Sequence, residues 1–195
     1  MALPPDLQRL IDEIDDADRR GAAIAASCTD DQFHWRPRDN QGWSIAQCLD
    51  HLGVMNLVYG TAIRTGIEAA QRRGSTRRGP GTPGYIGGKF VQSMEPPVTR
   101  RWRAPRKGKP SPTKDRQTIL DQSRAAHDLT RQLIADAAMI DANRARFKNP
   151  FLPLVRFSVA TGLFVIAAHD RRHLWQADQV KQAPGFPSSP GMITG

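Results

Sequence analysis

Two histidines lie four residues apart near the end of the chain, in the stretch AAHDRRHLWQ at residues 167–176. On a helix, side chains with this spacing share one face, so His169 and His173 could bind one metal ion together. The pair alone is weak evidence, because a buried histidine is usually just hydrogen-bonded. The interpretation depends on whether another segment brings a third ligand to the same place.

A third histidine is expected to face the pair from another helix. The residues S-I-A-Q at 44–47 form a capping box, which predicts that a helix begins there. His51 follows two turns later on a face of small and apolar residues, where a polar ring needs a partner. Metal sites in bundles are built from facing helices, and three ligands with open positions are typical of catalytic metals. We therefore expect His51, His169 and His173 to bind one divalent ion, with an affinity that falls below about pH 6.5.

Asp170 occupies the position that the glutamate base has in the H-E-x-x-H motif of zinc proteases. Aspartate is one methylene shorter, and no further protease ligand follows, so a metalloprotease is not expected. We expect Asp170 to orient a histidine or a metal-bound water, so that Asp170→Asn weakens metal binding by roughly 10–100-fold without unfolding the protein. The alternative is an ordinary helix acid paired with an arginine. Catalytic residues are otherwise unassigned.

Five other side chains are interpreted as structural. His127, on the third expected helix, can face the core of the bundle and is expected to support the metal site or the packing. His34 is expected at the surface or in a turn. Cys48 lies one turn before the third histidine and is interpreted as a packed thiol, because thiols are often buried. Trp43 and Trp175 are expected to anchor the core or the helix ends.

Helical periodicity dominates the chain, and no convincing strand alternation is present. Residues 29–42 are interpreted as a connector with a short turn, because they combine Pro37 with Asp39, Asn40 and Gly42. The sequence predicts an all-α four-helix bundle in a single domain, residues 1–195. The four helices are expected at about residues 5–26, 44 to the low seventies, 115–139 and 156–180.

A Gly-, Pro- and Arg-rich crossover separates the second and third of these helices, at about residues 72–114. Residues 72–116 hold 13 lysines and arginines against two acidic residues. This composition predicts an irregular, mobile segment that is dispensable for folding, so that a short linker could replace residues 74–112. Three roles stay open: a nucleic-acid contact that includes Trp102, a solvated loop over the bundle, or a site for an anionic substrate or thiol.

The composition favours a globular protein outside the membrane. The apolar fraction is 39%, and no apolar run is long enough to span a bilayer. The acidic N-terminal segment lacks the apolar core of a signal peptide. Only two cysteines are present, Cys28 and Cys48, which favours reduced thiols and a cytoplasmic location.

Two motifs resemble the signatures of the DinB/YfiT-like superfamily. They are WSIAQCLDHL at 43–52 and HDRRHLWQ at 169–176, and both FHWRP at 33–37 and PGFP at 184–187 fit the same layout. The resemblance implies a bundle with up-down-down-up connectivity and a long crossover between its second and third helices. It also implies a divalent ion, often zinc or nickel and in some cases iron, bound by residues that correspond to His51, His169 and His173.

The resemblance further implies a metal-dependent enzyme, because relatives include thiol S-transferases, a mycothiol-dependent isomerase and a metal hydrolase. We expect a thiol S-transferase or a hydrolase that acts on a small molecule, with a low-molecular-weight thiol as a candidate co-substrate and a homodimer as a candidate assembly. The alternative is a non-catalytic protein that binds nucleic acid or a partner through the basic crossover. No nucleic-acid-binding motif is present, which argues against specific base recognition.

Overall fold

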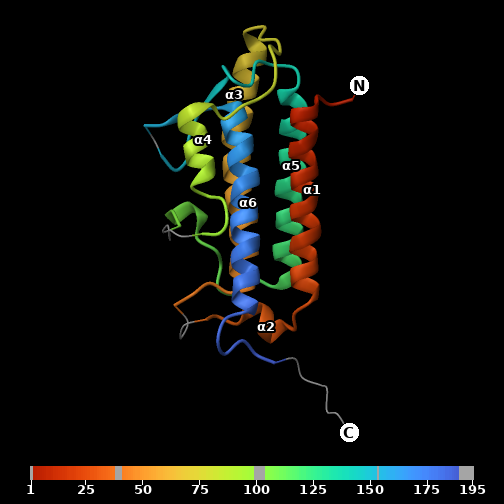
Figure 1. Cartoon of the computed structure of the whole chain (residues 1–195), viewed down its shortest axis with the longest axis vertical. Coiled ribbons are helices and arrows are strands. Elements are labelled where there is room, and N and C mark those ends of the chain that lie inside the picture. The colour runs from red at the N-terminus through yellow and green to blue at the C-terminus, as the bar shows by residue number, and fades with distance from the viewer. Residues whose placement is uncertain (1, 38–40, 99–103, 153, 189–195) are drawn as a thin grey trace.

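Four long helices lie side by side along the long axis of the computed structural model, which describes residues 2–37, 41–98, 104–152 and 154–188 (Figure 1). Figure 1 shows that two of them run from the N-terminal end of the bundle to the end at which α2 lies, and the other two run back. The first pair is α1 (Pro5–Ala26) and α6 (Val159–Lys181), and the second is α3 (Ile45–Arg72) and α5 (Arg116–Ala137). Within the described ranges, no helix has the length and apolar character that crossing a membrane requires.

Side-chain caps mark the starts of α3, α5 and α6, and the cap of α3 is the one that the sequence predicts. The Ser44 hydroxyl accepts a hydrogen bond from the backbone of Gln47, and the Gln47 side chain accepts one from the backbone of Ser44, each at 3.1 Å. Asp115 caps α5 and Ser158 caps α6 through the same kind of side-chain acceptor. Each cap binds an amide that has no partner within its helix, so the cap favours that start over neighbouring ones.

The apolar faces of the helices form two core clusters along the bundle. The first contains Leu7, Ile63 and Leu133 and occupies the end where the chain starts. The second contains Phe33, Leu49 and Leu174 and lies toward the α2 end. α3 packs against both α5 and α6, so its side chains are central to both clusters.

Short elements interrupt the segments between the long helices, and sequence analysis misses them. The connector contains α2 (Asp30–His34), which begins with a capping box of Thr29 and Gln32. β1 (Arg146–Lys148) and β2 (Arg156–Ser158) pair antiparallel, with Phe147 opposite Phe157. The expectation of no strands is therefore wrong, and α6 begins three residues later than predicted because residues 156–158 belong to β2.

The crossover is more ordered than its composition predicts. It contains α4 (Gly84–Gln92) and a 3₁₀ turn, η1 (Arg106–Gly108). A glycine of α4 allows this helix to pack closely on α6, because a Cβ at Gly87 would lie 2.7 Å from the Thr161 side chain. Phe90, Val91 and Met94 pack against the first core cluster. The expectation of an irregular segment is therefore wrong for α4 and η1, whereas its dispensability for folding stays a prediction. Trp102 lies outside the described residues.

Candidate metal centre

Three buried histidines converge from two helices. His51 comes from α3, and His169 and His173 come from successive turns of α6. One nitrogen of each ring lies within 4.8 Å of the other two. The ring centroids are 4.5 to 5.0 Å apart. The cap at Ser44 places the start of α3 six residues before His51. The spacing of four residues on α6 places His169 and His173 on one face of that helix. The structure therefore brings together all three predicted ligands.

A backbone carbonyl orients the His51 ring. Nδ1 of His51 donates a hydrogen bond to the carbonyl oxygen of Gly108, in η1. A carbonyl can only accept, so this contact requires the proton on Nδ1 and leaves the lone pair on Nε2. Metal-binding histidines are usually held in this way, with the second ring nitrogen bonded to a carbonyl or a carboxylate.

Burial keeps the three imidazoles neutral. Burial lowers the pKa of His51 to about 4, although the Gly108 carbonyl and Asp50 favour its protonated form. Burial also lowers the pKa values of His169 and His173 well below 6.5, and repulsion from the neighbouring histidines adds to this effect. A neutral imidazole is the form that binds a metal, so the site does not have to lose protons at neutral pH before binding.

The geometry and the donors fit a divalent ion with a preference for nitrogen. Zinc–nitrogen bonds are about 2.0–2.1 Å long, so two ligands of a tetrahedral ion lie roughly 3.4 Å apart. Separations of up to 4.8 Å need only small side-chain rotations to reach that value. In addition, Nδ1 of His173 is buried and makes no hydrogen bond within the described part of the chain. A buried, unpaired ring nitrogen is costly unless it gains a ligand.

Part of the crossover covers the site. We refer to residues 104–114 as the strap. A Cβ at Gly108 would lie 2.3 Å from Sδ of Met55 and 3.4 Å from Cε1 of His51, so the strap touches the ligand ring directly. Trp43 adds a second wall, because its ring stacks on His173 with centroids 5.7 Å apart. Access to the three histidines therefore depends on the strap and on Trp43.

The strap is attached to a residue next to a ligand. Asp50 is fully buried, and its carboxylate accepts hydrogen bonds from the Ser111 backbone at 2.7 Å and from Nζ of Lys114 at 2.5 Å. His34 also contacts the strap, because its Nε2 lies 3.1 Å from the Lys114 carbonyl oxygen. Thus His34 is exposed as expected and links α2 to the strap. Sequence analysis missed Asp50 and Gly108 because their partners are distant in the chain.

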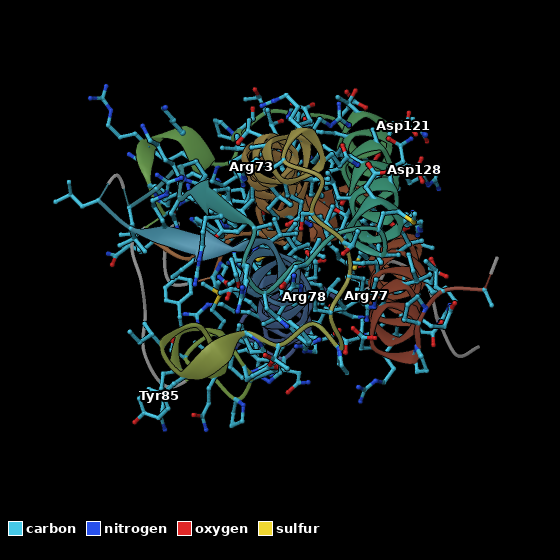
Figure 2. All side chains as sticks on the ribbon, turned by 90° about the horizontal axis from the view of Figure 1, so that it is seen from above. Arg73, Arg77, Arg78, Tyr85, Asp121 and Asp128 are labelled. Atoms are coloured by element: carbon cyan, nitrogen blue, oxygen red, sulfur yellow. The ribbon has the colours of Figure 1, made fainter. Side chains whose placement is uncertain are left out.

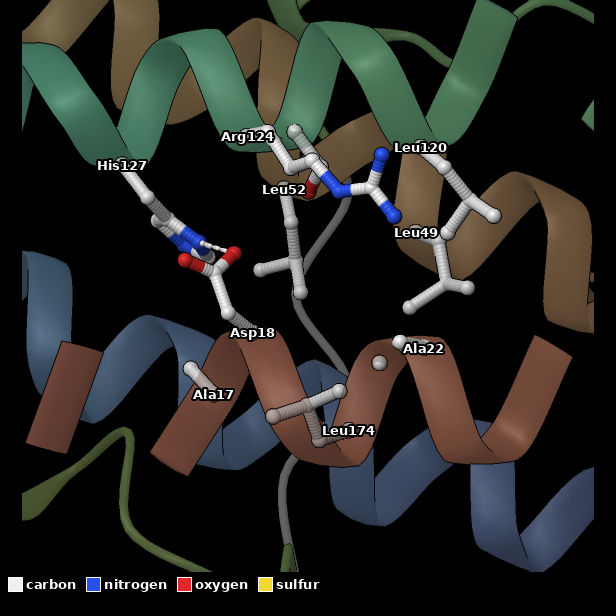
Figure 3. Close-up of a pocket in the computed structure, with 11 residues that line it drawn as sticks. Ala17, Asp18, Ala22, Leu49, Leu52, Leu120, Arg124, His127 and Leu174 are labelled. Carbon is white, nitrogen blue, oxygen red and sulfur yellow. Dashed lines mark hydrogen bonds and ion pairs between the residues drawn. The ribbon is translucent and has the colours of Figure 1, made fainter. Parts of the chain in front are cut away.

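Asp170 belongs to a second buried polar cluster. Its Oδ1 accepts a hydrogen bond from Asn56 at 2.7 Å, and its Oδ2 lies 3.3 Å from Nε2 of His127. Nδ1 of His127 lies 2.6 Å from the Asp18 carboxylate, which Figure 3 shows beside a small cavity between the helices. Asp170 therefore contacts Asn56 and His127, and its expected action on a metal ligand stays a prediction.

His127 is cationic in this cluster. Burial alone would lower its pKa, but Asp170 and Asp18 outweigh the burial and raise the pKa to about 10. The imidazolium bridges α5 to both α1 and α6. The structural role expected for His127 is consistent with these contacts. Cys48 is also fully buried, and burial raises the pKa of its thiol, so it is a packed thiol and not a thiolate.

The sequence profile of the DinB superfamily matches residues 13–177 of this chain. The chain belongs to the DinB superfamily. The matched region includes all three histidines, the whole of α3 and of the crossover, and α6 up to residue 177. Comparisons with curated proteins and with solved structures find no match to the chain.

Proposed function

We propose that this DinB-superfamily protein is a metal-dependent enzyme whose divalent ion is bound by His51, His169 and His173. The observation that carries the proposal is the convergence of three buried ring nitrogens within 4.8 Å of one another. Their depressed pKa values support it, because neutral imidazole is the binding form. The proposal includes the up-down-down-up connectivity of the family, in which the second and fourth helices of the bundle face each other.

When bound, the ion would supply a Lewis acid that activates a water or a thiol, or polarises a substrate carbonyl. The residues of the chain determine how that chemistry is used. The Gly108 carbonyl holds the His51 ring with Nε2 directed away from the strap bond. Trp43 and the strap restrict water at the site, which strengthens electrostatic interactions there.

Within this proposal, the reaction is a thiol S-transfer or a hydrolysis on a small molecule. Three protein ligands leave at least one coordination position for a nucleophile, as both reactions require. Zinc and nickel suit the all-nitrogen donor set, and iron is the third candidate. We place the protein in the cytoplasm, where a low-molecular-weight thiol is available and Cys28 and Cys48 stay reduced. The homodimer stays a prediction, which light scattering on the purified protein would test.

The alternative of a nucleic-acid-binding or interaction protein receives less support, because part of the basic segment is engaged within the protein. Arg77 pairs with Asp6 at 2.7 Å, and Lys114 pairs with the buried Asp50. Arg116 makes hydrogen bonds to Asp30 and to backbone carbonyls of the α1–α2 region. These cations stabilise the attachment of the crossover, so they do not form a free surface for a polyanion.

Metal analysis of untagged protein tests the proposal. We expect one divalent ion per chain, and we expect His51→Ala or His173→Ala to remove it while circular dichroism stays helical. His34→Ala is the matched control, because it removes an exposed histidine that is none of the three convergent ones and loses only one contact at the end of the strap, so the ion should remain. The proposal is wrong if wild-type protein refolded with zinc, nickel or iron holds no metal, or if His51→Ala keeps its metal. If the metal is present, assays of the wild-type protein for thiol transfer and for ester or amide hydrolysis would distinguish the two candidate reactions.

A further inference from the structure

We propose that the end of the bundle opposite the α2 end carries a separate binding site for a phosphate-bearing small molecule. A concave pocket of about 250 Å³ lies there, between the loop that follows α3 and the turn that follows α5. Its charged lining consists of Arg73, Arg78, Arg144 and Asp141. Figure 2 looks down on this end of the molecule and shows Arg73 and Arg78 near the ends of the helices.

The arginines of this pocket have few carboxylate partners. In the described ranges, Arg73 and Arg78 make no ion pair or side-chain hydrogen bond, and the nearest carboxylate oxygen to Arg144 is 3.8 Å away, on Asp141. By contrast, Arg77 in the same loop binds both oxygens of Asp6, and Arg131 pairs with three carboxylates. Arg77 is thus neutralised by a carboxylate, whereas Arg73, Arg78 and Arg144 share only Asp141, of the described carboxylates, around one concavity.

The pocket has a net positive charge that an anion would neutralise. Three arginines and a single aspartate line the pocket, and Oδ1 of that Asp141 carboxylate already accepts a hydrogen bond from the Arg144 backbone at 3.1 Å. Like charges held together repel, so a bound anion stabilises this arrangement. A guanidinium group binds two oxygens of a phosphate in a planar fork, and several arginines together suit its double charge.

The helix end by itself does not explain the charges. α3 ends at Arg72, and the partial negative charge of its C-terminus accounts for basic residues at Arg72 and Arg73. Arg78 and Arg144 belong to other segments, which the helix dipole does not reach. Their placement in the same pocket therefore needs a different explanation, and a bound anion provides it.

The walls of the pocket are fixed without a ligand. Gly74 adopts a φ of +65°, which a residue with a side chain rarely adopts, and this turns the chain away from α3. The Ser75 backbone amide then bonds the Ala70 carbonyl at 3.0 Å, and its hydroxyl accepts from the Asp141 backbone at 3.1 Å. The two segments that carry the arginines are thereby joined to each other, which lowers the entropy cost of binding.

The size and position of the pocket favour a small ligand at a site distinct from the metal centre. A volume of 250 Å³ is slightly below the range of pockets for drug-sized ligands, so it suits one or two phosphate groups with little else. His51 and Arg73 lie near opposite ends of α3, roughly 30 Å apart at a rise of 1.5 Å per residue. The proposed anion site is therefore independent of the three-histidine site and of its reaction.

Inorganic pyrophosphate is the probe for this proposal, measured by isothermal titration calorimetry. The titration uses the metal-free His51→Ala protein, because pyrophosphate could otherwise bind an ion at the three histidines. We expect saturable binding, and we expect Arg78→Gln/Arg144→Gln to weaken it at least tenfold. Arg72→Gln is the matched control, because Arg72 is exposed and adjacent in sequence to Arg73 but does not line the pocket. The pyrophosphate affinity of this variant should stay within twofold of that of the parent protein.

Two outcomes would overturn the proposal. One is the absence of pyrophosphate binding up to 10 mM at low ionic strength in protein whose melting curve is cooperative. The other is equal weakening by Arg72→Gln and by the pocket variants, which would indicate a diffuse basic surface. A single-stranded oligonucleotide serves as a second probe: if it binds more tightly than pyrophosphate and with a steeper salt dependence, the ligand is a nucleic-acid backbone and not a small phosphate.

Discussion

The Gly108 carbonyl accepts a hydrogen bond from Nδ1 of His51, although 57 positions separate the two residues in the chain. This contact makes the strap part of the candidate metal centre, because it determines which nitrogen of His51 is available to an ion. Asp50, the neighbour of His51, receives hydrogen bonds from Ser111 and Lys114 of the same strap. The position of the strap and the geometry of the ligand are therefore coupled.

Gly108→Val should weaken metal binding. The new side chain would collide with Met55 and contact His51, and we expect the strap to shift and the hydrogen bond to Nδ1 to be lost. Loss of such an orienting contact lowers metal affinity by about 10–100-fold. A competition titration with a chromophoric chelator measures the change. Gly88→Ala is the control, since its Cβ would have an ordinary contact, at 3.8 Å from Pro83. Equal affinities of Gly108→Val and wild type would show that the strap does not orient His51.

Metal affinity should persist to lower pH than the unperturbed pKa of histidine implies. A proton competes with the ion only near and below the pKa of the ligand, and that pKa is about 4 for His51 in the folded protein. We therefore expect a nearly constant affinity from pH 7 to about pH 5 and a steep loss below, instead of the loss near 6.5 expected from the sequence. Titrations at half-unit intervals of pH would check this, and a midpoint near 6.5 would contradict the burial of the site.

His127 should stabilise the fold in neutral solution and lose this effect in alkaline solution. Its pKa is about 10 when folded and about 6.5 when unfolded, so the stabilisation is complete below pH 6.5 and disappears as pH rises toward 10. His127→Gln should cost about 3–5 kcal/mol, because Asp170 is left buried beside a neutral group. Urea unfolding at pH 6, 8 and 10 measures both effects. A variant that shows the same alkaline loss as wild type would exclude His127 as its cause.

Asp170→Asn tests the role expected for Asp170 at the metal site. The substitution removes the negative charge of Asp170 beside the His127 imidazolium and so should reduce the stability of the fold. If Asp170 also orients a metal ligand, metal affinity should fall by about 10–100-fold in this variant while His127→Gln retains it. Chelator competition on both folded variants separates the two roles. Equal affinities in the two variants would limit Asp170 to the buried cluster that it forms with Asn56 and His127.

Phe90→Ala should destabilise the protein even though Phe90 lies in the crossover. Its ring packs 5.2 Å from the ring of Phe157, next to the first core cluster, so its removal should cost about 1–3 kcal/mol. Tyr85→Ala on the same helix is the control, because Tyr85 is 83% exposed and its loss should change stability by less than about 0.5 kcal/mol. Equal melting temperatures for the two variants would show that α4 does not contribute to the core.

The long helices and the convergence of three histidines could be predicted because their signals are local. The capping box at Ser44 and Gln47 fixes the start of α3, and the spacing of His169 and His173 places two rings on one face. The motifs at residues 43–52 and 169–176 then predicted His51 as the third candidate ligand and predicted the DinB superfamily, and the superfamily is confirmed. In each case the informative residues lie within a few turns of one another, so the backbone hydrogen bonds of one helix convert sequence spacing into geometry.

Only the tertiary structure decided which residues surround the ligands and what the crossover does. The partner of His51 is a backbone carbonyl, and a carbonyl at Gly108 has no signature in the sequence. α4 and the paired strands β1 and β2 are short, and contacts with distant segments stabilise them against their weak local preferences. His127 is a cation because two aspartates from other helices reach it across the core. These features depend on contacts between residues far apart in the chain, which form only when the helices pack.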